Sequence, residues 1–463
     1  MTGKPSDGTD APPNRLQRVV FGFPSLPHAL IAYPFYSLLP AFYAANTQVT
    51  LAQIGLVAAA CRIFDAITDP LLGYLSDKTR TRIGSRKPWM LAAILVMATG
   101  TVQLFNPPAS ANFLYFGIWS WVLYIGFSMF ELPRSAWASE ITRDYGERSK
   151  LAATVGAFNI AGSLTVYALP IGMSFFTGSS AIGVDTMNAL SIVYLVAMPA
   201  GIITAVLLVP KGNPVSNRSL SVFSAIRSLS RCKPLLRFYA IISLWALGQG
   251  AFMAVSFIFQ TEYLGLREEF AYVMITYFAA SLFFMPLWSR ILIKIDRHRI
   301  WGTFVALGTS CGLIALMLPR GPEAFIPILF LTVLRGFLGT PQNFLSGAVL
   351  SDVIDYETLK SGTNKAGNMF ALQNMLISIC MAIGGAVSFV VLDISGFQMG
   401  QPSTPGGDLG IIICYIFIPL TFHLMMALLC WNFPINRTRH AIIQRRLDQR
   451  SRRLLRSPET HAV

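Results

Sequence analysis

Charge is scarce in this chain: of its 463 residues only 13% are Asp, Glu, Lys or Arg, whereas 54% are hydrophobic. Soluble globular domains carry about 25% charged residues. The shortage of charge therefore excludes an ordinary soluble domain. It indicates a chain that places much of its apolar surface in lipid.

Cysteine and histidine are also scarce. The six cysteines are scattered singly and the five histidines show no ligand spacing, so that neither a disulfide framework nor a metal site is indicated. No nucleophile and base pair stands out either. We therefore expect no enzyme activity, no cofactor and no metal held by cysteine or histidine side chains. A membrane enzyme or a membrane sensor stays the alternative, although the tail at 451–463 is too short for a sensor domain.

Long apolar runs are what the chain has in abundance. Each is long enough to cross ~30 Å of hydrocarbon as a helix. They cover residues 19–44, 51–76, 88–105, 113–138, 151–176, 188–209, 235–263, 270–293, 300–318, 324–351, 368–392 and 411–433. The sequence predicts an all-α membrane protein of twelve transmembrane helices in two six-helix halves.

Lysine and arginine accumulate in alternate loops, whereas the opposite loops carry only Arg267 and Arg320. Because basic loops stay in the cytoplasm, we expect both termini to be cytoplasmic. The predicted segments are an N-terminal tail (1–18), a first bundle (19–209), a central loop (210–234), a second bundle (235–433) and a basic tail (434–463). The basic tail is typical of a solvated anchor, with contact to nucleic acid or anionic lipid as the alternative. We expect membrane lipid and no nucleic acid as a partner.

Three charged residues interrupt the second apolar run. Arg62, Asp65 and Asp69 are spaced so that a helix places them on one face. Two carboxylates one turn apart in a low dielectric repel each other unless a proton or a cation lies between them. Ionisable groups inside a membrane helix indicate a functional site. The alternative is a structural one, in which the acid pair is tied to Arg62 and holds helices together.

The fourth apolar run carries a second polar stripe of Tyr124, Ser128 and Glu131. A carboxylate can accept hydrogen bonds from two sugar hydroxyls, which suits the selection of a polar ligand. A salt bridge between Glu131 and Arg62 is the alternative, and the two roles can alternate in one transport cycle.

Two stretches carry a family resemblance. Residues 62–89 read RIFDAITDPLLGYLSDKTRTRIGSRKPW and residues 351–367 read SDVIDYETLKSGTNKAG. They resemble the signatures of the glycoside, pentoside and hexuronide cation symporters, the melibiose permease-like family of the major facilitator superfamily. The resemblance follows essentially the whole chain in order and spacing.

The resemblance implies that Asp65 and Asp69 bind the coupling cation, with the hydroxyls of Thr68 and Ser128 as further ligands. Thr68 stands where the family has an asparagine, so Na⁺ and H⁺ both remain open. The resemblance also implies that Glu131 binds substrate. The family's charged residues on helices 1, 5 and 11 are replaced here, near Pro27, Gly156 and Ser378, which makes the pocket less polar.

The expected substrate-binding residues are polar or aromatic side chains at mid-membrane depth, for which an interhelical hydrogen bond is the alternative role. They are Arg62, Tyr124, Glu131, Trp245, Gln249, Gln342 and Gln373. Charged residues of two cytoplasmic loops are expected to form a gate between the halves. They are Asp77, Arg80, Arg82, Arg86, Asp352, Asp355 and Lys360.

The function that the resemblance implies is cation-coupled symport of a small sugar or glycoside across a bacterial inner membrane by alternating access. An amphipathic, lysolipid-like substrate is the alternative within the class. We expect the protein to work as a monomer.

Overall fold

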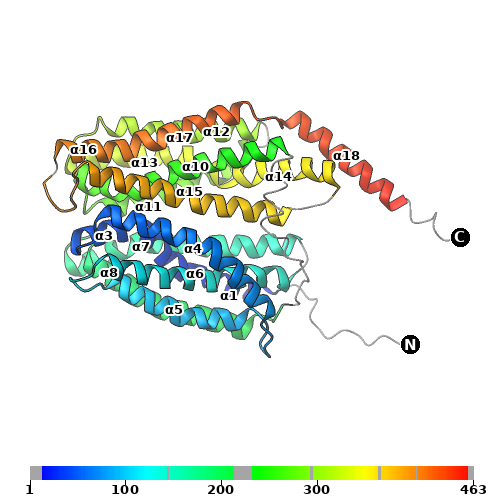
Figure 1. The fold of residues 1–463 in the computed structure, drawn as a ribbon. Helices are drawn as coiled ribbons and strands as arrows, with labels where there is room; N and C mark the ends of the chain where they lie inside the picture. Colours follow the sequence, from blue (N-terminus) through cyan, green and yellow to red (C-terminus); the bar gives the residue numbers. More distant parts are fainter. Residues whose placement is uncertain are drawn as a thin grey trace.

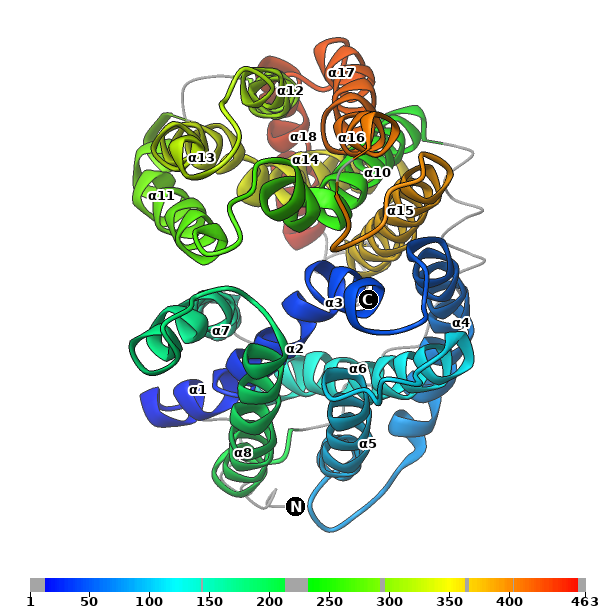
Figure 2. The same ribbon diagram turned by 90° about the vertical axis from the view of Figure 1, so that its left-hand side faces the viewer.

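The computed structural model describes residues 13–142, 145–212, 232–291, 296–362, 366–402 and 404–456, and every regular element in these ranges is a helix. The helices form two bundles that lie side by side, one from α1 to α8 and one from α10 to α17 (Figure 1). Seen along the helices, α4 of the first bundle lies against α15 of the second, and α7 lies against α11 (Figure 2). Most of the predicted N-terminal tail and central loop lies outside the described residues.

In the described part of the chain, the first bundle contains eight helices. They are α1 (Arg15–Gly22), α2 (Ser25–Ser37), α3 (Leu39–Asn46), α4 (Leu51–Lys78), α5 (Lys87–Phe105), α6 (Phe113–Ile141), α7 (Tyr145–Thr177) and α8 (Val184–Leu208). Side-chain caps fix several starts: Thr50 and Gln53 form a capping box at α4, and Asn112 accepts from the backbone of Tyr115 at α6. These caps satisfy backbone donors that a helix leaves free.

The second bundle follows after residue 232. Its elements are α10 (Lys233–Ile258), the π-helix η1 (Phe259–Tyr263), α11 (Phe270–Ile291), α12 (Arg297–Ala315), the short η2 (Pro322–Ala324), α13 (Phe325–Gly339), α14 (Gln342–Ser361), α15 (Ala366–Ile394), α16 (Pro405–Ile412), the π-helix η3 (Ile413–Phe417) and α17 (Ile418–Trp431). The last predicted span thus begins at Pro405 rather than at residue 411. A final helix, α18 (Arg437–Arg456), extends beyond the bundle (Figure 1).

The predicted count of twelve spans agrees with this arrangement. Ten segments of the described chain are long and apolar enough to cross a membrane as continuous helical runs. The other two are the predicted first span, divided into α1, α2 and α3, and α12, which opens on the charged residues Arg297 and Arg299.

Prolines divide two of the spans, because proline donates no backbone hydrogen bond and its ring clashes with the preceding turn. Pro24 lies between α1 and α2, and Pro40 lies in the first turn of α3. Pro341 separates α13 from α14 in the tenth span. Irregular backbone at membrane depth occurs where it lines a cavity or is buried in protein, so these breaks point to the centre of the molecule.

The two bundles meet at the end of the molecule away from the termini. Glu268, in the loop before α11, accepts hydrogen bonds from the hydroxyl of Ser179 at 2.7 Å and from the backbone N–H of Ser180 at 2.6 Å, both in the loop before α8. Gly55 near the start of α4 packs on the backbone of Ala386 near the end of α15. The halves are therefore closed on each other at this end.

The basic tail forms the helix α18, whose start packs on the second bundle and whose described side chains are mostly exposed. His440 Nε2 lies 3.0 Å from Asp355 Oδ2 and 3.4 Å from Asp352 Oδ1, and Gln444 donates to Asp355 at 2.6 Å. Ile443 is buried at the same contact. These contacts hold the start of α18 against α14.

We predict that Gly250→Ala destabilises the protein. A Cβ at Gly250 in α10 would clash with the backbone carbonyl of Met381 in α15, so the two helices would have to separate. Overpacking of this kind costs roughly 1–3 kcal/mol. Thermal unfolding of the purified protein measures the loss. Gly172→Ala is the matched control, since a Cβ there meets open space; equal unfolding midpoints for the two variants would contradict the prediction.

We predict that Glu268→Ala loosens the closed end. The hydrogen bond from Ser179 and those from Ser180 hold the pKa of the Glu268 carboxyl group below its ordinary value. The contact is therefore complete at neutral pH and is lost only as the pH falls through that lowered pKa. Backbone hydrogen exchange at Ser180 should become at least about tenfold faster in the variant. The neighbouring Glu269→Ala should leave the exchange rate at Ser180 unchanged. An unchanged rate in Glu268→Ala would contradict the role of Glu268 in closing this end.

Candidate functional site

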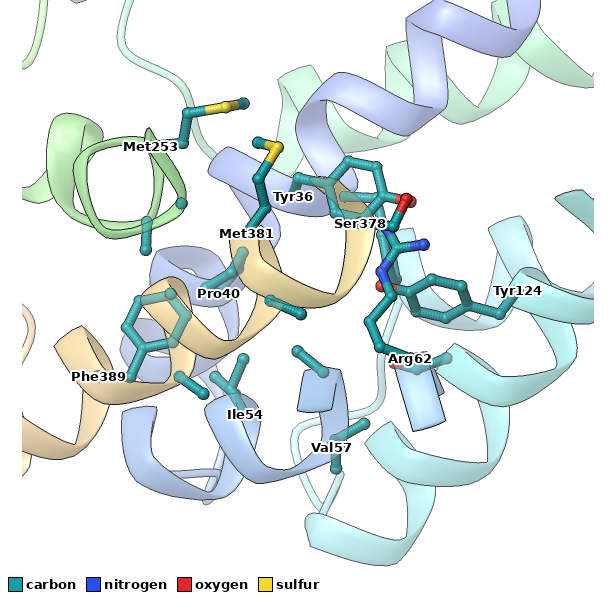
Figure 3. A pocket seen from close by; sticks show the side chains of 18 of the residues that line it. Tyr36, Pro40, Ile54, Val57, Arg62, Tyr124, Met253, Ser378, Met381 and Phe389 are labelled. Carbon is teal, nitrogen blue, oxygen red and sulfur yellow. The ribbon is translucent and has the colours of Figure 1, made fainter. Parts of the chain in front are cut away.

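Arg62 is the centre of the polar cluster on α4. Its Nη1 lies 3.2 Å from Asp65 Oδ2, and its Nη2 donates to the Tyr36 hydroxyl at 2.8 Å. The guanidinium carbon lies 4.8 Å from the centre of the Tyr124 ring (Figure 3). The ion pair and two aromatic rings thus stabilise a charge that would be costly alone in hydrocarbon.

Asp69, one turn further along α4, lacks such a partner. Its Oδ1 is buried and makes no hydrogen bond among the described residues, whereas the Ser128 hydroxyl of α6 lies beside the carboxyl group. The hydroxyl of Thr68 donates to the backbone carbonyl of Phe64 at 3.1 Å. The structure therefore brings Asp65, Asp69 and Ser128 together and leaves one carboxylate oxygen free to bind a proton or a cation.

Glu131 pairs with a residue that the sequence analysis did not single out. Both of its carboxylate oxygens accept from Arg134 Nη2 at 2.8 Å, and His28 Nδ1 lies 3.6 Å from Oε1. The alternative salt bridge to Arg62 is therefore not the pairing found. Arg134 is three residues away on the same helix, a spacing that predicts such a pair.

A first cavity of about 170 Å³ lies between the two bundles. Tyr36, Arg62 and Tyr124 line it from the first bundle, and Ser378 and Met381 of α15 line it from the second (Figure 3). The charge of Arg62 therefore faces the boundary between the halves, with apolar side chains around it.

A larger cavity of about 450 Å³ lies mainly within the second bundle. It shares Met253 and Met381 with the first cavity and is also lined by Trp245, Gln249 and Arg335. A small polar recess beside it adds His423 and Gln342. Two of the predicted substrate-binding residues, Trp245 and Gln249, thus face the larger cavity.

The other two predicted glutamines are engaged or enclosed by protein. Gln342, which lines the recess, accepts a hydrogen bond from the indole of Trp301. Gln373 is buried, and its Oε1 makes no hydrogen bond among the described residues. Gln342 therefore also has the interhelical role that was its alternative.

Among the predicted gate residues, Asp77, Arg86, Asp352 and Asp355 form ion pairs, each within its own bundle. Arg86 lies 2.5 Å from Asp77 and 2.9 Å from Glu140, all in the first bundle. Arg297 lies 2.9 Å from Asp352 in the second. A gate between the halves formed by Asp77, Arg80, Arg82, Arg86, Asp352, Asp355 and Lys360 thus stays a prediction for another conformation.

Arg335 on α13 is the main residue that the sequence analysis missed. It donates to the Tyr415 hydroxyl at 2.6 Å, and its guanidinium lies 4.2 Å from the centre of the Phe252 ring. The signal was present, because an arginine within the apolar run 324–351 is as anomalous as Arg62. His423, whose Nδ1 lies 2.6 Å from the Thr309 hydroxyl, was also missed, although a histidine within the apolar run 411–433 is the same kind of signal.

Proteins with related sequences are transporters. The chain is 25% identical over 431 residues to a protein named "Putative glycoside/cation symporter YagG" from Escherichia coli (strain K12), covering 89% of this chain and 90% of that one. It is 24% identical to the isoprimeverose transporter of Lactiplantibacillus pentosus, over 82% of this chain and 80% of that one. It is 21% identical to the sodium-dependent lysophosphatidylcholine symporter 1 of Xenopus tropicalis, over 90% and 87%.

The fold is that of solved transporters. The crystal structure of the nucleoside transporter NupG superimposes with a TM-score of 0.59 at 14% identity, over 91% of this chain and 98% of that one. The family described as MFS/sugar transport protein matches residues 20–437, which confirms the family predicted from residues 62–89. The chain therefore belongs to the MFS/sugar transport protein family and is a multi-pass membrane transporter, not an enzyme.

Proposed function

We propose that the protein carries a small sugar or glycoside across the bacterial inner membrane together with a cation that binds at Asp65 and Asp69. The observation that supports the ion site is the buried, unpartnered oxygen of Asp69, one turn from Asp65 and beside Ser128. A carboxylate without an ion pair at this depth is costly. Binding of Na⁺ or H⁺ removes that cost.

The proposed cycle is alternating access between two bundles. With both termini in the cytoplasm, the closed end formed by Glu268, Ser179 and Ser180 faces the outside, so the described conformation is closed toward the outside. Binding of the ion neutralises Asp69 and lowers the free energy needed to close the bundles around the site. Because this changes the equilibrium between the two conformations, ion and substrate move together.

The substrate side of the proposal is supported by the polar groups on the central space. Gln249 and Arg335 line the larger cavity, and the relatives named for a glycoside and for isoprimeverose support a sugar-type ligand. Glu131 is held by Arg134 and His28 in the described state. We propose that it exchanges this pairing for substrate hydroxyls during the cycle.

A lysolipid-like substrate is the second candidate. It is favoured by the apolar lining of the first cavity, which includes Phe35, Ile54 and Phe389, and by the relative named for lysophosphatidylcholine. Uptake of a labelled lysophospholipid, with no uptake of any sugar in the same vesicles, would favour this candidate.

We predict that Asp65→Asn and Asp69→Asn each abolish uphill accumulation. A thermal-shift screen of monosaccharides and methyl glycosides with the purified protein, with and without Na⁺, first selects the sugar. Uptake of that sugar into proteoliposomes under an imposed Na⁺ or pH gradient is then measured. Both variants should still bind the sugar or exchange it in counterflow, but they should no longer accumulate it against its concentration gradient. The reason is that an amide carries no negative charge to balance the charge of the ion.

Asp393→Asn is the matched control, since Asp393 is exposed at the end of α15. It should accumulate sugar as the native protein does. Concentrative uptake in both Asp65→Asn and Asp69→Asn would remove the ion-site assignment. Catalysis of a chemical change without translocation would refute the transport proposal altogether.

We predict that Glu131→Gln weakens sugar binding by about tenfold or more, because hydrogen bonds to an ionised group contribute more than neutral ones. The thermal shift caused by the coupling ion should stay the same. Glu140→Gln on the same helix is the control, since Glu140 pairs with Arg86 outside the cavities. A larger effect on the ion than on the sugar would move Glu131 to the ion site.

A further inference from the structure

Arg335 lies deep in the second bundle. It follows the start of α13 by ten residues, which places it roughly 15 Å along the helix axis, near the middle of the ~30 Å hydrocarbon layer. It lines both the larger cavity and the polar recess beside it. A substrate that occupies the larger cavity would therefore contact Arg335 at this depth.

Arg335 differs from the other two arginines inside the bundles. Arg62 and Arg134 each have a carboxylate within 3.2 Å, from Asp65 and Glu131. Across the described ranges, Arg335 forms no ion pair and donates one hydrogen bond, to Tyr415. The guanidinium carries five N–H donors, so most of its capacity, and its whole charge, are left for a ligand.

The groups around Arg335 hold it in place without cancelling its charge. The guanidinium lies over the ring of Phe252 and at 5.5 Å from that of Tyr415. Tyr415 belongs to the π-helix η3 and stacks on Phe259 of the π-helix η1, with ring centres 3.9 Å apart. Single π-helical turns are frequent at functional sites. Here two of them fix the tyrosine that orients the arginine.

The remaining polar groups on this side are neutral. Gln249, Asn343, Thr309 and His423 line the recess together with Arg335. Both ring nitrogens of His423 are engaged, by the Thr309 hydroxyl and the Trp245 carbonyl. Among the described residues, no aspartate or glutamate lines the first cavity, the larger cavity or the recess. This side of the central space is therefore positive and offers hydrogen bonds for hydroxyl groups.

We propose that Arg335 is the binding residue for an acidic group of the substrate, so that the transported molecule is an anionic sugar derivative. This inference rests on the proposed sugar symport and narrows it. One arginine matches the single charge of a carboxylate, and the planar guanidinium can bind both of its oxygens. A phosphate ester offers the same kind of contact but would bring a second charge, for which the lining of the larger cavity and the recess has no second cation among the described residues.

The test compares sugars that differ only in the acidic group. D-Glucuronate, D-glucose and D-glucose 6-phosphate are titrated into the purified full-length protein, and binding is measured by thermal shift and by isothermal titration calorimetry. The native protein should bind D-glucuronate at least about tenfold more tightly than D-glucose. D-Glucose 6-phosphate is the arm that separates a phosphate from a carboxylate.

Arg335→Gln should reduce D-glucuronate affinity by about tenfold or more and leave D-glucose binding unchanged, and Arg335→Lys should restore part of the loss. Arg320→Gln is the matched control, because it removes the same charge from an arginine that pairs with Asp408 outside the cavities. The unfolding midpoint of each variant is measured without ligand to identify any variant that fails to fold. If Arg335→Gln does not fold, the D-glucuronate affinity of Arg335→Lys relative to the native protein is the deciding measurement.

Equal binding of D-glucose and D-glucuronate, or an equal loss of both in Arg335→Gln, would overturn the inference while leaving sugar symport intact. Tighter binding of D-glucose 6-phosphate than of D-glucuronate would overturn the carboxylate assignment. Binding of no sugar of any kind would overturn the proposed function itself, so the two failures are distinguishable.

Discussion

The structure depends on the cost of leaving a charge unpaired inside hydrocarbon, which is about 2.5–3.5 kcal/mol for a residue at the centre of a membrane helix. In the first bundle, Asp65 compensates Arg62 and Glu131 compensates Arg134. Each pair joins residues three positions apart on one helix, so the pairing is built into α4 and α6 before the helices pack. What remains after this compensation is one carboxylate, Asp69.

Breaks in the helices bring the functional groups to the centre. Pro341 ends α13 six residues after Arg335, and the π-helical turns η1 and η3 place Phe259 and Tyr415 face to face. A continuous α-helix repeats every 3.6 residues and offers only one face to the cavity. The interruptions rotate or redirect the chain, so that aromatic and charged side chains from three spans reach the same space.

Much of this could be predicted from the sequence, for identifiable physical reasons. Span number follows from the thickness of the bilayer, and the charges of α4 and α6 are visible because apolar runs rarely carry any. The pairing of Glu131 with Arg134 was also readable from their spacing. The contacts of Arg335 were not, because Tyr415 and Phe252 lie far from it along the chain, and Tyr415 is placed by the π-helix η3, which has no side-chain signature. Packing in three dimensions, rather than local pattern, selects them.

Asp69 in the first bundle and Arg335 in the second each form no ion pair among the described residues, and their charges have opposite signs. A cation alone would neutralise Asp69 and leave Arg335 charged in a cavity that must close. An anion alone would leave Asp69. Only the two together remove both costs, and the closed state is then favoured relative to either singly loaded state. If each residue binds its ligand as proposed, the obligation to carry both follows from charge balance alone, without direct contact between ion and substrate.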